Sequence, residues 1–180
     1  MALHMVQHLL LITAVPALLL AGAPQVVGAL FGQRASSAGS TAGGAGGCLA
    51  IGTALLFILH VPALVDAGLT NPWINDAQHL MLIVAGAIIA WPLLGPNPLP
   101  GFGAVLFLVA AEFLVGFLGI VIAWSPTLLY EGYGDVERFG GLSPADDQAV
   151  AGAILLVVEE PLLLAELAVL FIRALNTSEE

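Results

Sequence analysis

The chain has 180 residues, of which 59% are hydrophobic and 9% are charged, and its mean hydropathy is +1.03. Soluble domains are roughly half apolar and about a quarter charged, so this composition excludes a soluble globular domain and a disordered tail. Three Lys and Arg residues against thirteen Asp and Glu leave no basic patch, which excludes nucleic acid as a partner. A single cysteine, Cys48, excludes a disulfide framework and cysteine-based metal sites. We therefore expect an all-α, polytopic bundle of membrane helices in contact with lipid.

Five apolar segments follow one another along the chain. A membrane span needs about 20 apolar residues to cross about 30 Å of hydrocarbon. The segments predict a single transmembrane domain over residues 1–180, with spans at about 3–30, 48–65, 77–94, 102–124 and 145–174. A cleaved signal peptide is disfavoured for the first segment because no Lys or Arg precedes its apolar run.

The connections between these spans differ in character. Residues 33–47 are rich in Gly and Ser and predict a flexible linker, whereas residues 125–144 predict a polar loop. Residues 66–75 predict a turn, in which Asn75 or Asp76 is expected to cap the helix that follows.

Positive charges suggest an orientation in the membrane. With five spans, Arg34 and Arg173 fall on one face and Arg138 falls on the face that holds the N-terminus. Cytoplasmic loops carry an excess of Lys and Arg. We therefore expect the N-terminal face to be extracytoplasmic in a prokaryotic plasma membrane.

All four histidines are expected near this same face. His4 and His8 are separated by four residues, so their imidazoles project from one side of the first helix. His60 lies late in the second span, which travels towards the N-terminal face, and His79 lies at the start of the third span. Neutral imidazoles are ligands for copper, zinc and iron. The pattern therefore predicts a metal site formed by His4, His8, His60 and His79.

Polar residues near the fifth span fall at the same level of the membrane. Asp147 and Gln148 are expected to orient an imidazole or to complete the coordination of the ion. Tyr130 and Tyr133, in the loop before that span, are expected to shape a lid over the site.

Two other interpretations of the histidines stay open. Two histidines on facing helices also hold haem b in membrane cytochromes, which would make the protein an electron-transfer subunit. Alternatively, the histidines bond water, headgroups or loop carbonyls in a metal-free structural subunit of a respiratory complex. The sequence has no Gly-rich phosphate loop, no Ser–His–Asp order and no His-Glu-x-x-His motif, so we do not expect an enzyme.

Acidic residues within the spans form a second feature. Glu112, Glu159 and Glu160 lie in apolar segments, where a charged carboxylate is costly unless it is paired or protonated. They predict a proton or cation relay, or else protonated carboxyl groups that hydrogen-bond between helices.

Five short motifs occur in order along the chain: His4-Met5-Val6-Gln7-His8, His60-Val61-Pro62, Gln78-His79-Leu80, Tyr130-Glu131-Gly132-Tyr133 and Asp147-Gln148-Ala149-Val150-Ala151-Gly152. Together they resemble the cytochrome c oxidase assembly factor family of the CtaG type, which is associated with caa-type haem–copper oxidases. The resemblance extends over nearly the whole chain, in a form shorter than is usual for the family.

This resemblance implies a membrane copper chaperone of the respiratory chain, which delivers the ion to the catalytic subunit of a haem–copper oxidase. The four histidines, with Asp147 and Gln148, fall at motif positions of the family. Leu155 stands where the pattern leads us to expect Met, which removes a soft ligand for Cu(I). The resemblance nevertheless implies copper as the ion, with zinc or haem b as alternatives, and self-association is left open.

Overall fold

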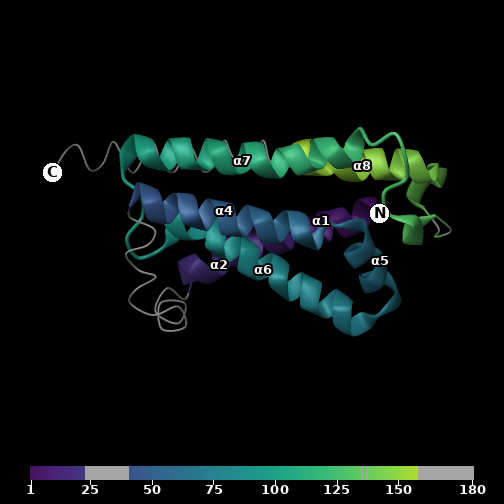
Figure 1. Ribbon diagram of the computed structural model, residues 1–180, viewed down its shortest axis with the longest axis horizontal. Coiled ribbons are helices and arrows are strands. Elements are labelled where there is room, and N and C mark those ends of the chain that lie inside the picture. Colours follow the sequence, from purple (N-terminus) through teal and green to yellow (C-terminus); the bar gives the residue numbers. More distant parts are fainter. Residues whose placement is uncertain (23–40, 135, 137, 158–180) are drawn as a thin grey trace.

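The computed structural model describes residues 1–22, 41–134, 136 and 138–157, and all regular structure in these ranges is helical (Figure 1). The helices are α1 (Ala2–Ile12), α2 (Ala14–Gly22), α4 (Ala42–Leu59), α5 (Pro62–Thr70), α6 (Pro72–Leu94), α7 (Gly101–Ala123) and α8 (Pro144–Val157). Two short 3-10 helices, η1 (Glu131–Tyr133) and η2 (Phe139–Gly141), lie in the connection between α7 and α8.

Three segments are long and apolar enough to cross a membrane: Ala2–Leu20, Pro72–Leu94 and Gly101–Ala123. A fourth crossing results if Gly43–Leu59 and Pro62–Thr70, which meet at an angle of 59°, count as one broken span. The all-helical membrane class is thus confirmed, but the described residues supply three or four candidate spans where we expected five. Of the fifth expected span only α8, with 14 residues, is described. Residues 23–30 of the first and 158–174 of the fifth lie outside the described ranges, as do Arg34 and Arg173.

Two boundaries differ from those expected. Helix α4 begins at Ala42, so the end of the Gly/Ser-rich stretch is helical rather than a linker; the Thr41 side chain accepts the Gly44 N–H at 3.1 Å and caps the helix. Helix α6 begins at Pro72, because the Asn71 side chain accepts the Trp73 N–H at 3.0 Å and proline is favourable in a first turn. The cap that we expected at Asn75 or Asp76 is therefore supplied by Asn71.

Proline causes the break between α4 and α5. The second span was expected to continue to residue 65, but the residue before a proline is disfavoured in the helical conformation. Val61, which precedes Pro62, is extended with φ −61° and ψ 129°. The helix therefore ends at Leu59, His60 caps it, and α5 sets off in a new direction.

Close backbone contacts bring the helices together. A Cβ atom at Gly86 of α6 would lie 2.0 Å from the Ile12 carbonyl oxygen of α1 and 2.8 Å from Pro16 Cγ of α2. A Cβ atom at Gly152 of α8 would lie 2.5 Å from the Gly119 carbonyl oxygen of α7. Only glycine permits these approaches, as small residues commonly do between membrane helices. They pack α1 and α2 on α6, and α8 on α7.

The main core cluster lies among α1, α4, α6, α7, α8 and the loop before α8. Its members include Met5, Leu56, Leu82, Ile122 and Tyr130. The start of α1 lies at the same end of the molecule as α5 and the loop before α8 (Figure 1). Phe102, Phe113 and Trp124 of α7 are each at least 70% exposed, which suits a surface in contact with lipid.

Candidate metal centre

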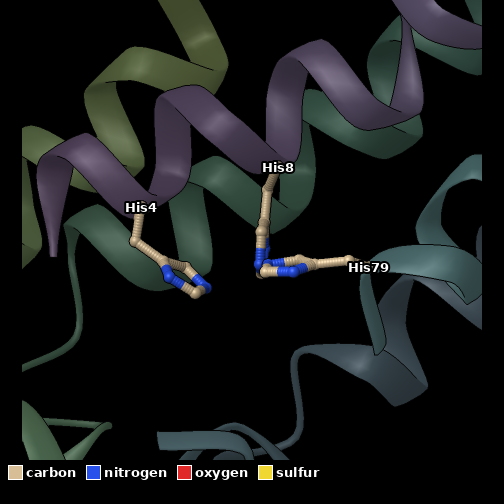
Figure 2. A group of neighbouring side chains, drawn as sticks. All are labelled: His4, His8 and His79. Atoms are coloured by element: carbon tan, nitrogen blue, oxygen red, sulfur yellow. The ribbon is translucent and has the colours of Figure 1, made fainter. Parts of the chain in front are cut away.

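Three histidines converge from two helices. His4 and His8 lie one turn apart on α1, and His79 reaches them from α6 (Figure 2). One ring nitrogen of each lies within 4.8 Å of those of the other two. The ring centroids of His4 and His8 are 4.1 Å apart, and that of His79 lies 5.3 Å from His8 and 5.5 Å from His4. The sequence prediction that these three side chains gather at one end of the bundle is confirmed.

The spacing is compatible with one bound ion. Nitrogen ligands at about 2.0–2.1 Å from a tetrahedral ion are about 3.4 Å from one another. Nitrogens now within 4.8 Å of one another would have to move closer together to reach that separation. His8 is buried and the other two are half-buried, so the group is partly shielded from its surroundings.

Two polar atoms beside this group are buried without a hydrogen-bond partner among the residues that the structure describes. One is Nε2 of His79 and the other is the hydroxyl oxygen of Tyr133. The Tyr133 ring centroid lies 6.0 Å from that of His4. Buried polar atoms are nearly always satisfied, so two unpaired atoms beside three imidazoles indicate a place for a ligand.

The other ring nitrogen of His79 has a neighbour that the sequence reasoning missed. Nδ1 of His79 lies 3.4 Å from the Asn75 side-chain nitrogen, one turn earlier on α6. An amide nitrogen can only donate, so Nδ1 of His79 accepts in this contact and the neutral ring carries its proton on Nε2. Nε2 becomes free to bind an ion when the Asn75 amide turns its oxygen towards Nδ1, which then carries the proton. The signal was present in the sequence, because Asn75 and His79 are four residues apart and so share one face of a helix.

His60 does not join the three-histidine group. Its Nε2 lies 3.3 Å from Nδ1 of His8, and its Nδ1 lies 2.8 Å from the Leu56 carbonyl oxygen. It is 6% exposed, and it is not one of the histidines whose ring nitrogens lie within 4.8 Å of one another. Three of the four expected histidines therefore form one group, whereas His60, at the end of α4, contacts His8 and the Leu56 carbonyl.

The two tyrosines lie near the histidines but have different partners. The Tyr130 hydroxyl, buried in the core, donates to the His60 carbonyl oxygen at 3.1 Å. Burial raises the pKa of Tyr130, and burial together with the carboxylates of Asp147 and Asp66 raises the pKa of Tyr133 to about 12. Both hydroxyls therefore keep their protons at neutral pH. The Tyr133 hydroxyl can donate a hydrogen bond, but it has no acceptor among the described residues.

Asp147 acts on the start of α1. Its carboxylate accepts from the Met1 nitrogen at 2.7 Å and from the Ala2 N–H at 3.0 Å, and it faces Arg138 at 3.9 Å. The first N–H groups of a helix have no partner within the helix, and a carboxylate there satisfies them. Asp147 thus holds α1, and with it His4 and His8, rather than an imidazole.

Gln148 holds the loop. Its Oε1 accepts the Leu129 N–H at 2.7 Å, and its Nε2 donates to the Thr127 carbonyl oxygen at 3.1 Å. Asp66 of α5 adds a link, since it accepts the Gly132 N–H at 3.1 Å. Gln148 and Asp66 therefore hold the backbone of the loop that carries Tyr130 and Tyr133.

The acidic residues of the spans lie apart from this centre or outside the described residues. Glu112 is half-buried in the middle of α7 and is not a member of the histidine group. Glu159 and Glu160 lie outside the described ranges. The relay that we expected from these three carboxyl groups stays a prediction.

The helices and the histidine group define a class, a polytopic helical membrane protein that could hold a metal ion at one end of its bundle. The family model for the cytochrome c oxidase caa3 assembly factor matches residues 1–177. The chain belongs to this family, which confirms the resemblance seen in its motifs. No curated protein and no solved structure matches it.

Proposed function

We propose that this protein binds a copper ion through His4, His8 and His79 during assembly of a haem–copper oxidase. The observation that carries the proposal is the convergence of three imidazole nitrogens within 4.8 Å, beside the unpaired Nε2 of His79. Membership of an oxidase assembly factor family supplies the process in which the ion would be used.

Two arguments favour copper: the ligand atoms are imidazole nitrogens, and the family is that of a cytochrome c oxidase assembly factor. Imidazole suits copper, zinc and iron, and at a given site of nitrogen ligands Cu²⁺ binds more tightly than the other first-row divalent ions. Three neutral nitrogens leave one coordination position of a tetrahedral ion open. A water molecule could bind there and accept a hydrogen bond from the Tyr133 hydroxyl. An open position suits an ion that is passed on, because an incoming ligand can attack without displacing a histidine first.

We propose a non-catalytic role in which the ion is cargo and the catalytic subunit of the oxidase receives it. A haem is less well supported than a single ion. Haem ligation uses two opposed imidazoles with a porphyrin between them, whereas here the rings of three histidines converge, with centroids 4.1–5.5 Å apart.

The test is the metal content of the protein purified in mild detergent without a histidine tag. After incubation with Cu²⁺, or with Cu⁺ under ascorbate, and removal of the excess, we expect about one copper per chain and no Soret band. His4→Ala, His8→Ala and His79→Ala should each lose most of this copper. Gln7→Ala, an exposed neighbour on α1, is the matched control and should retain it.

Other results would count against the proposal. Copper retained at full stoichiometry in all three histidine variants would place it elsewhere. A Soret band in the wild-type protein would indicate a cytochrome. Protein that takes up neither copper nor haem would indicate a structural subunit.

We also propose that the histidine group lies near the extracytoplasmic face, as the distribution of arginines suggests. Glu131 is exposed in the loop over the group, so it can report the side of the membrane. In a Cys48→Ser background, Glu131→Cys should react with a membrane-impermeant maleimide on intact cells. Reaction only after lysis would place the group at the cytoplasmic face.

A further inference from the structure

His60 lies at the break between α4 and α5, and three of its polar atoms have partners. Nδ1 faces the Leu56 carbonyl oxygen at 2.8 Å, Nε2 faces Nδ1 of His8 at 3.3 Å, and the backbone carbonyl accepts the Tyr130 hydroxyl at 3.1 Å. A histidine held this firmly and this deeply has little freedom to turn towards an ion.

The Leu56 carbonyl decides which ring nitrogens of His60 and His8 carry protons. The Leu56 carbonyl oxygen can only accept, so Nδ1 of His60 carries a proton. A neutral imidazole has one N–H, which leaves a lone pair on Nε2 of His60. That lone pair accepts from Nδ1 of His8, so His8 also carries its proton on Nδ1 and presents the lone pair of Nε2.

We infer that His60 is a positioning residue that fixes the tautomer and ring orientation of His8. The inference rests on the proposed metal site, in which His8 would bind through Nε2. A ligating histidine nearly always donates its other N–H to an acceptor that orients the ring and raises the basicity of the ligating nitrogen. Here the acceptor is a second imidazole, which the Leu56 carbonyl orients in turn.

The competing interpretation is that His60 and His8 both bind the ion. A separation of 3.3 Å is also close to that of two nitrogens on one tetrahedral ion. In that case His8 would bind through Nδ1, with the ion between His8 and His60. The group of three nitrogens within 4.8 Å does not extend to His60, so such an ion would lie off the convergence of His4 and His79. The two interpretations require opposite tautomers of His8.

The first test reads the tautomers directly in the metal-free protein. The chain has only four histidines, so ¹⁵N-histidine labelling in detergent micelles gives a simple spectrum, which His60→Gln and His8→Gln variants assign. We expect His60 and His8 both to be protonated on Nδ1, with Nε2 at the shift of an unprotonated nitrogen. A proton on Nε2 of His8 would overturn the inference. Because no metal is present, this result does not depend on whether the proposed function is correct.

The second test separates positioning from ligation. Glutamine carries its Oε1 the same number of bonds from Cα as Nε2 of histidine, so His60→Gln keeps an acceptor for His8, whereas His60→Leu removes it. We expect His60→Gln to bind copper within about threefold of the wild-type affinity and His60→Leu to bind about 10- to 100-fold more weakly, the range seen when such supporting residues are lost. Equal and complete loss in both variants would show that His60 is a ligand.

The combined outcomes distinguish the two proposals. A wild-type protein that shows the expected tautomers but takes up no copper would refute the metal-binding function and leave the contact between His60 and His8 standing. Wild-type copper affinity in His60→Leu would refute the positioning role while leaving the three-histidine site intact.

Discussion

The contact between α1 and α6 at Gly86 should control the affinity of the histidine site, although Gly86 is not a ligand. A Cβ atom there would lie 2.0 Å from the Ile12 carbonyl oxygen and 2.7 Å from its carbonyl carbon. Both are backbone atoms, so no side-chain rotation relieves the clash. Ordinary contact begins at 3.4 Å, so Gly86→Ala must move the two helices apart by about 1.4 Å.

This movement separates the ligands, because His4 and His8 belong to α1 and His79 belongs to α6. The three nitrogens must already draw together to reach the separation of about 3.4 Å around one ion. We expect Gly86→Ala to weaken copper binding at least tenfold, or about 1.4 kcal/mol. Overpacking of this kind should also destabilise the fold by about 1–3 kcal/mol.

The measurement is a copper competition titration on Gly86→Ala, with thermal unfolding in detergent followed by tryptophan fluorescence. Gly116→Ala on α7 is the matched control, since among the described residues its Cβ atom would meet only the Leu156 side chain, at an ordinary 3.5 Å. It should leave affinity and stability near those of the wild type. Wild-type affinity in a folded Gly86→Ala protein would refute the argument that this contact sets the distance between the ligands.

Three further predictions concern the residues around the site. Asp147→Ala removes the carboxylate that holds the start of α1, so it should lower both the unfolding temperature and the copper affinity. Asp146 is the neighbouring residue and is exposed, so Asp146→Ala should change both quantities much less. Equal effects of the two substitutions in the same titrations would contradict this role. Tyr130→Phe loses the hydrogen bond to the His60 carbonyl and should cost about 1 kcal/mol of stability without metal. Tyr133→Phe removes an unpaired hydroxyl and should cost nothing until copper is bound, so a large loss in the metal-free protein would show that this hydroxyl is already satisfied.

Local properties of the sequence predicted the class of this protein and much of its site. Apolar runs of about 20 residues indicate membrane helices wherever they occur, because the thickness of the hydrocarbon requires that length. The separation of four residues between His4 and His8 places both imidazoles on one face of any α-helix. The family motifs, confirmed over residues 1–177, depend likewise on residues read in order along the chain.

The roles of individual side chains depended on how the helices pack. The sequence did not distinguish His60 from the other histidines, but in the fold it lies at the break before Pro62, where it faces a carbonyl and the imidazole of His8. Asp147 was expected beside an imidazole, yet it meets the first N–H groups of α1, because the contact at Gly152 sets where α8 packs. Distances between helices are set by close contacts between residues far apart in the chain, and no local pattern encodes them. The sequence alone therefore determined which residues gather at this end of the membrane bundle, and only the tertiary structure decided which of them bring their ring nitrogens within 4.8 Å of one another.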